Sequence, residues 1–428
     1  MSFPFVLLAM LSALDQQQLQ RGIDEQTRAG KPFLIPSGVH STGTLRLSSG
    51  AHIRFAPNAI LRMLPQNADF VPIETLGFNP FADIETSRFE HALFFASDAD
   101  GVTIEGPGRI ECARNARGGP KPISLRRCRN VKLQEITIDQ APNYAISLID
   151  CVKVDISHVK ITRSWADGID IDGSRNVTIR DTEVESFDDA ICLKTSASLG
   201  RKIATRQILV ENCRLKTASV FFKLGTESWG DFSGIRVRKL KLEGGMGNRH
   251  GNPGIALETV DGGTISNVVV EDVVMTNVGT PIFLRIGDRK RAPGSPSAGQ
   301  MTGIRLSRIQ ASGTRFASVI AGLNDAPIRR LTLEDFNIEP VGERGTFEAK
   351  SKVPEARSAY PEPIQFGPIP ASAFFFRHVS GLGLRNIEYL RPPASPSILL
   401  DNVTGSWPKC KAIGANRFDC SGAFGKRR

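Results

Sequence analysis

The sequence predicts an all-β chain wound into a right-handed parallel β-helix, a solenoid whose coils contribute strands to long parallel sheets. Three observations support this fold class. Runs of Val and Ile are short and 40 glycines are spread along the chain, as short strands joined by tight turns require. A repeat with a period near 23 residues emerges from about residue 100. The second strand of each repeat carries two aligned apolar columns.

The chain opens with an apolar run and one predicted helix. The run MSFPFVLLAMLSALD resembles a signal-peptide core, although it lacks a basic flank and a clean cleavage site. On this signal we expect a secreted or periplasmic protein. From about Asp15 to Gly30 the sequence is amphipathic and ends at a glycine, which predicts a helix. Because a β-helix exposes its first coil, we expect this helix to cap that end.

The repeat is expected to build one domain spanning residues 1–428. Copies begin at Cys128 (CRNVKLQEITI), Cys151 (CVKVDISHVKI) and Ser174 (SRNVTIRDTEV), 23 residues apart each time. Alternate residues of a strand point to opposite faces, so the apolar columns face one core and the residues between them face outward. Residues 1–30 are interpreted as a signal remnant and cap, and about 340–428 as late coils and an irregular tail. The columns are Ile146, Ile169, Ile191, Phe222, Ile255 and Ile282, and Leu148, Ile171, Leu193, Leu224, Leu257 and Leu284.

Three aspartates gather at one edge of these strands. Asp167 opens the strand DGIDID and Asp189 opens DAICLK, in the same column of adjacent coils, and Asp188 precedes Asp189. Neighbouring carboxylates raise one another's pKa, and one protonated carboxyl beside an ionised one is what general acid–base catalysis needs. Two other interpretations stay open: ordinary turn aspartates, which are common, and a calcium site.

These stretches resemble glycoside hydrolase family 28, the polygalacturonase family. That family carries an Asn-Thr-Asp-Gly motif and, about one coil later, an Asp-Asp pair; here the matching stretches are WADGIDIDGSRNVTIRD and SFDDAICLKTS. The resemblance covers roughly residues 15–340. It implies an inverting hydrolase of α-glycosidic bonds in a pectin-type or other acidic polysaccharide, without metal or cofactor. Asp188 would be the general acid, and Asp167 and Asp189 would activate a water.

The sequence departs from the family pattern at three places. Trp165 and Ala166 replace the Asn and Thr before Asp167. The family's Gly-His-Gly motif is absent from the segment ASVFFKLGTES, where it is expected near residues 219–221. The Arg-Ile-Lys motif, which grips a galacturonate carboxylate, is replaced by Ala-Leu-Glu at residues 256–258. These departures argue against ordinary homogalacturonan as the substrate.

Substitute substrate ligands are expected on the outward columns and in nearby loops. Trp165 and Tyr144 could stack on a sugar ring, although Trp165 could equally be packed. A ladder of structural ion pairs, Asp172–Lys194 and Glu258–Arg285, is the alternative to substrate binding by the charged residues. The candidate substrate-binding residues are Lys194, Lys223, Trp165, Tyr144, His250 and Glu258.

Composition limits the other possibilities. The net charge of +10 and the pI near 9.4 favour anionic partners, here an acidic polysaccharide or oligosaccharide, since the chain shows no nucleic-acid-binding module. No run approaches the roughly 18 apolar residues of a membrane span. Five of the seven cysteines are expected to be small buried residues, and Cys410 and Cys420 could form one bridge. A monomer is the expected state.

Competing functions are a β-helix polysaccharide lyase or epimerase, and a non-catalytic carbohydrate-binding β-helix.

Overall fold

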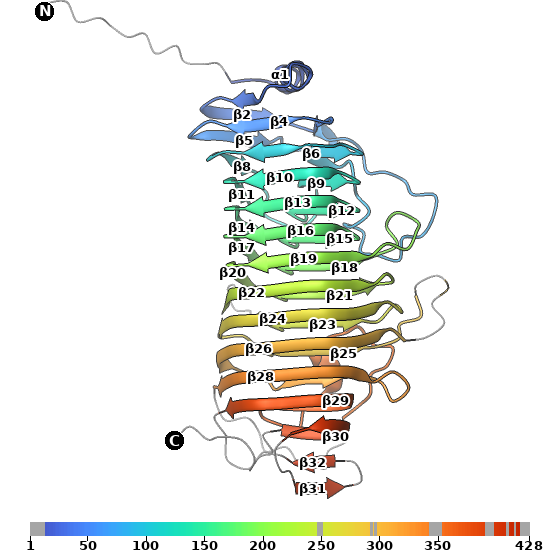
Figure 1. The fold of residues 1–428 in the computed structure, drawn as a ribbon. Helices are drawn as coiled ribbons and strands as arrows, with labels where there is room; N and C mark the ends of the chain where they lie inside the picture. Colours follow the sequence, from blue (N-terminus) through green and yellow to red (C-terminus); the bar gives the residue numbers. More distant parts are fainter. Residues whose placement is uncertain are drawn as a thin grey trace, which may run out of the picture.

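The computed structural model is a long stack of β-coils capped by one helix (Figure 1). It describes residues 13–245, 251–291, 294, 298–341, 353–389, 398–407, 411–414 and 417–419. Helix α1 (Gln16–Arg28) lies on the first coil, with Leu19 and Ile23 buried against it. Asp15 caps its N-terminus, accepting a hydrogen bond from the backbone amide of Gln18 at 2.8 Å. The predicted capping helix is confirmed.

Each coil contributes strands to three parallel sheets. Sheet 1 contains β3 (Leu45–Arg46), β6 (Ala92–Ser97), β9 (Lys121–Arg126), β12 (Ile146–Ile149), β15 (Ile169–Asp172), β18 (Ile191–Thr195), β21 (Phe222–Ser228), β23 (Ile255–Thr259), β25 (Ile282–Ile286) and β27 (Ser318–Ala321). Sheet 2 contains β1 (Phe33–Ile35), β4 (His52–Phe55), β7 (Thr103–Glu105), β10 (Arg129–Gln134), β13 (Val152–Ser157), β16 (Arg175–Arg180) and β19 (Thr205–Glu211). Sheet 3 contains β2 (Gly38–Thr42), β5 (Ala59–Met63), β8 (Arg109–Glu111), β11 (Thr137–Asp139), β14 (Lys160–Ser164), β17 (Glu183–Ser186) and β20 (Arg214–Thr217).

In the later coils, long strands serve two sheets at once. These are β22 (Phe232–Gly244), β24 (Thr264–Thr276), β26 (Gln300–Thr314) and β28 (Ile328–Pro340), followed by β29 (Phe374–Tyr389) and β30 (Ile398–Ser406). The short strands β31 (Lys411–Gly414) and β32 (Arg417–Asp419) pair antiparallel with each other, and β32 pairs antiparallel with β30. After residue 340, the described strands β29 and β30 continue the parallel stack. No helix in the described part of the chain has the length and hydropathy of a membrane span.

The predicted apolar columns form the core beneath sheet 1. Ile146 pairs with Ile169, Ile169 with Ile191 and Ile191 with Phe222, one coil apart each time. All the residues of both columns are 0% exposed. The residue at one place near the start of the sheet 2 strands has a positive φ in three successive repeats: Asn130, Lys153 and Asn176 have φ of 51°, 58° and 56°.

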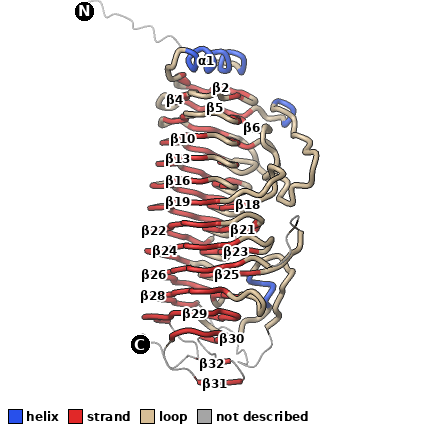
Figure 2. The backbone as a smooth tube through the Cα atoms, turned by 45° about the vertical axis from the view of Figure 1, so that its right-hand side comes forward, coloured by secondary structure: helices blue, strands red, loops and turns tan. Residues whose placement is uncertain are grey.

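Two segments cover the outward side of sheet 1. Residues 65–91, the proximal segment, form the long loop that descends beside the coils, and residues 353–373, the distal segment, lie further along the stack (Figures 1 and 2). Phe89 packs on outward residues of β6, and Val353 and Phe366 pack with outward residues of β23, β25 and β27. The outward side chains of sheet 1 are therefore mostly buried, which the strand pattern did not predict.

Candidate active site

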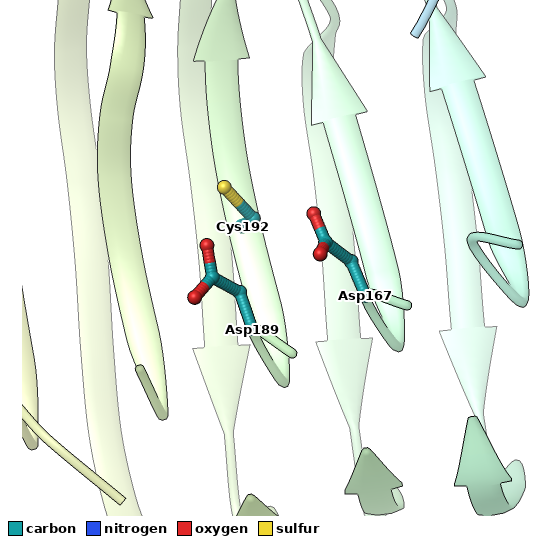
Figure 3. A group of neighbouring side chains, drawn as sticks. All are labelled: Asp167, Asp189 and Cys192. Carbon is teal, nitrogen blue, oxygen red and sulfur yellow. The ribbon is translucent and has the colours of Figure 1, made fainter. Parts of the chain in front are cut away.

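The carboxylates of Asp167 and Asp189 lie side by side on neighbouring coils (Figure 3). Each precedes a strand of sheet 1, β15 and β18, and these strands pair with Ile169 opposite Ile191. Side-chain oxygens of both aspartates and the Cys192 sulfur all lie within 4.8 Å of one another. Asp167 is 3% exposed and Asp189 is 4% exposed. The predicted common column is confirmed.

Asp188 is the most accessible of the three and is held by an arginine. Its side chain is 29% exposed, and the Arg117 guanidinium donates to its Oδ2. Arg117 also donates to Glu85 Oε1 at 2.8 Å. Burial raises the pKa of Asp188, but attraction to Arg117 and Lys223 outweighs burial and holds the pKa below its usual value. Asp188 is therefore predominantly ionised in the unliganded protein.

Asp189 is fixed as an acceptor by three donors. Ser219 Oγ and the Val220 amide donate to its Oδ1 at 2.9 and 3.2 Å. The Lys223 ammonium lies 3.1 Å from its Oδ2. Burial alone would lower the pKa of Lys223, but Asp189 and Glu258 raise it well above the ordinary value. Lys223 therefore stays charged and pairs with Asp189.

Beneath Asp167 lies a buried lysine that binds several acids. Lys194 Nζ is 2.7 Å from Asp170 Oδ2 and 3.3 Å from Asp167 Oδ2, and it donates to the Tyr144 hydroxyl at 2.9 Å. Burial raises the pKa of Asp167 well above its usual value; Lys194 opposes this rise, and Asp188 and Asp189 add to it. The pKa values of Asp167 and Asp188 are therefore shifted in opposite directions.

The predicted ladder of ion pairs is wrong although its register is right. Lys194 faces Asp172 across the strands, and Glu258 faces Arg285. Asp172 instead accepts hydrogen bonds from the turn after β18, including the Ser196 amide at 2.8 Å, so its oxygens are occupied. Arg285 donates to two backbone carbonyls of the distal segment at 2.8 Å.

The two predicted sugar-stacking rings lie in different surroundings. Tyr144 is 0% exposed, with Lys194 Nζ 4.4 Å from its ring centroid, so it offers no face to a sugar and that expectation is corrected. Trp165 is half-buried and stacks on Phe187 with centroids 4.4 Å apart, and its Nε1 donates to the Arg114 carbonyl at 2.8 Å. These contacts favour the packed interpretation of Trp165. His250 lies outside the described residues.

Comparison with known proteins places the chain in a family. The model of the Glycosyl hydrolases family 28 matches residues 83–356, more than half of the chain, including all three aspartates. The chain belongs to glycosyl hydrolase family 28. A probable polygalacturonase of Arabidopsis thaliana is 25% identical over 280 residues, covering 60% of each chain. An endo-polygalacturonase of Pectobacterium carotovorum is 24% identical over 294 residues, 63% of this chain and 68% of the relative.

Solved structures confirm the β-helix. An exopolygalacturonase from Thermotoga maritima superposes with a TM-score of 0.65 at 18% identity, covering 88% of each chain. A polygalacturonase from Erwinia carotovora gives a TM-score of 0.58 at 19% identity, covering 76% of this chain and 89% of that one. A surface adhesin of Streptococcus pneumoniae also gives 0.58, at 12% identity over 92% and 93% of the two chains. At such identities these likenesses establish the fold alone.

Several residues at the family 28 site were not identified from the sequence. A cavity of about 270 Å³ lies beside the aspartates, and its lining includes Asp83, Tyr360 and Glu362. Asp83 belongs to the proximal segment and the other two to the distal segment, so no repeat pattern marks them. Arg117 likewise comes from a loop between β8 and β9. Asp170 could have been found, because it is an acid at an outward position of DGIDID.

The donor set does not fit calcium. Calcium takes six to eight oxygen ligands, whereas the cluster of Asp167 and Asp189 has the Cys192 sulfur as its third member. Burial raises the pKa of that thiol well above the ordinary value, and its sulfur donates to the Gly225 carbonyl at 3.1 Å. The ammonium groups of Lys194 and Lys223 already supply positive charge to the two carboxylates.

Glu258 predicts a pH dependence of stability. Its side chain is 1% exposed, and burial raises its pKa from 4.5 to about 8. Between these values the folded protein holds a proton that the unfolded chain has released, so stability falls as pH rises, by up to about 1.4 kcal/mol per pH unit. Glu258→Gln should flatten this slope in urea unfolding measured from pH 5 to 8. An unchanged slope in the variant would contradict the assignment.

Proposed function

We propose that this family 28 protein hydrolyses an α-glycosidic bond of a pectin-type polysaccharide with inversion of configuration. The observation that carries the proposal is the meeting of Asp167, Asp188 and Asp189 at one cavity. The names of the relatives agree, but the chain spans only about 60% of the length of the plant relatives matched first. Activity and substrate are therefore proposals.

In the proposed reaction, Asp188 protonates the glycosidic oxygen as its bond to the anomeric carbon breaks. Water attacks that carbon from the opposite side, and its proton passes to the carboxylate of Asp189 or Asp167. Asp189 suits the base role because Ser219 and Val220 orient its carboxylate by donating to it. Asp188 suits the acid role because it is the most exposed carboxyl of the three, and because Arg117 lowers its pKa, it carries the proton that this role needs only at acidic pH.

The lyase alternative needs a neutral lysine or arginine as the base. Lys194 and Lys223 are the lysines that line the cavity, within the described residues. Burial lowers the pKa of each, but acidic partners outweigh burial and raise both values well above the ordinary one. Both ammonium groups therefore hold their protons, which favours hydrolysis over elimination.

A binding function without catalysis is the second alternative, because the same fold occurs in a bacterial surface adhesin. A sugar-binding surface gains nothing from gathering three carboxyl groups of which two are buried, since like charges repel and burial of charge is costly. The clustering of Asp167, Asp188 and Asp189 therefore favours an enzyme.

The deciding experiment follows product release from a panel of pectic and neutral polysaccharides. New reducing ends without ultraviolet absorbance, and inverted anomeric signals in NMR spectra of the first products, would support the proposal. Absorbance of an unsaturated product would assign the protein to the lyases. Binding without any product would assign it to the adhesin-like group.

We further propose that the protein acts outside the cytoplasm and as a monomer. The location follows from the proposed substrate, since a pectin-type polymer is too large to enter a cell. The monomer follows from helix α1, which covers the first coil and so keeps that end from stacking on a second copy. Cell fractionation and light scattering of the purified protein would test the two statements.

Arg117 should set the pH range of the proposed reaction. A general acid works only while protonated, so activity falls as pH rises through its pKa. Because Arg117 depresses the pKa of Asp188, Arg117→Gln should move this fall in kcat/KM to higher pH. The Arg117 side chain is 42% exposed, so the fold should tolerate the change. An unmoved alkaline limb would instead assign the acid role to Asp167.

A further inference from the structure

The cavity beside the three aspartates has many acids and few bases. Six carboxyl side chains border it, whereas two lysines do so among the described residues. The acids are Asp83, Asp167, Asp188, Asp189, Glu258 and Glu362, and the lysines are Lys194 and Lys223.

Both lysines are already engaged by acids. Lys223 lies 3.1 Å from Asp189 Oδ2, and its side chain is 9% exposed. Lys194 lies 2.7 Å from Asp170 and 3.3 Å from Asp167, and its side chain is 3% exposed. Neither ammonium can turn toward a ligand carboxylate without leaving a buried acid unpaired, which is costly.

The arginines around the cavity are also bound. Arg117 bridges Glu85 and Asp188. Arg289 lies 2.6 Å from Asp261, and Arg291 lies 3.1 Å from Glu227. A carboxylate placed in the cavity would therefore lie among other carboxyl groups, including the ionised Asp188, without an unengaged cation among these groups, and like-charge contacts of this kind oppose binding.

Glu258 borders the cavity with an unused polar atom. It is 1% exposed, and its Oε2 has no hydrogen-bond partner among the described residues. Leaving a buried polar atom unpaired costs free energy, which a ligand hydroxyl would recover. Sugar hydroxyls can both donate to and accept from carboxyl groups, so an uncharged sugar suits this lining better than a uronate, which brings a further negative charge.

We propose that the sugar residue bound in this cavity is uncharged, a neutral hexose or deoxyhexose, and that Glu258 hydrogen-bonds one of its hydroxyls. This inference rests on the proposed hydrolysis for its reaction but concerns the sugar that the site accepts. The uronate residues of a pectin-type chain then lie outside the cavity.

The test compares two matched ligands, pectic oligosaccharides and the same oligosaccharides after chemical reduction of their carboxylates to primary alcohols. Linkage and ring stereochemistry are unchanged between them. We expect the reduced form to bind the full-length protein at least about tenfold more tightly in calorimetry, and to be cleaved with a higher kcat/KM by a similar factor. Equal or tighter binding of the acidic form would overturn the inference.

Failure of the inference and failure of the proposed function give different results. If neither the acidic nor the carboxyl-reduced oligosaccharides are cleaved, but the carboxyl-reduced ones still bind more tightly, the hydrolysis proposal fails. The inference that the cavity binds an uncharged sugar then stands. If the acidic form is both bound and cleaved in preference, hydrolysis stands and the assignment fails.

Variants of Glu258 test whether this side chain causes the preference for the reduced, uncharged oligosaccharides. Glu258→Gln keeps a hydrogen-bonding group without charge, so it should retain the preference for the reduced form. Glu258→Lys places a cation in the cavity and should narrow or reverse the preference. Circular dichroism and thermal unfolding show that each variant is folded. The same preference in a folded Glu258→Lys variant would refute the role assigned to Glu258.

Discussion

Asp188→Asn should lower hydrolysis about 10²- to 10⁴-fold while leaving the fold intact, since a general acid contributes a factor of this size. The amide cannot give its proton to the glycosidic oxygen. The expected cost in stability is small, because the Asp188 side chain is 29% exposed and its pairing with Arg117 is partly solvated. Reducing ends released from the best substrate of the panel measure the effect.

Two controls sharpen this result. Asp98→Asn removes an aspartate that does not line the cavity and whose side chain is 60% exposed and pairs with Arg127, so it should leave activity unchanged. An aryl glycoside with a good leaving group needs little protonation, so Asp188→Asn should lose much less activity on it. Equal losses on both substrates would contradict the acid role.

Lys194→Met should destabilise the protein by about 3–5 kcal/mol, the cost of removing one member of a buried ion pair. The substitution keeps the length of the side chain but leaves Asp170, which is 0% exposed, without its cation 2.7 Å away. It also removes the ammonium 3.3 Å from Asp167, so activity should fall with stability. The free energy of unfolding in urea is the measurement.

A surface ion pair and a compensating substitution test whether burial of the Lys194–Asp170 pair causes this loss of stability. Lys160 pairs with Glu183 at 3.2 Å, with both side chains more than half exposed, so Lys160→Met should cost at most about 1 kcal/mol. Adding Asp170→Leu to Lys194→Met removes the stranded charge and should restore part of the lost stability. If Lys194→Met unfolds at the same urea concentration as the parent, the buried network does not stabilise the fold.

The repeat and its two apolar columns were sufficient to predict the β-helix, the register of sheet 1 and the shared column of Asp167 and Asp189. Such patterns are local and periodic. The 23-residue repeat determines which residues of neighbouring coils lie next to each other, and the two-residue period of a strand determines which side chains face the core. The capping helix was predictable for the same reason, because its amphipathic face and its terminal glycine lie within one short stretch.

Partners across the cavity were decided by the tertiary structure alone. Lys194 stands opposite Asp172 in register, yet its ammonium binds Asp170 and Asp167 because serines 196 and 198 occupy Asp172. The proximal and distal segments bury the outward side of sheet 1, which removes Tyr144 from solvent and brings Tyr360 to the cavity. Strand periodicity predicts which face of the sheet a side chain lies on. The burial, the ion-pair partners and the pKa of that side chain depend on covering loops that are distant in sequence and belong to no repeat.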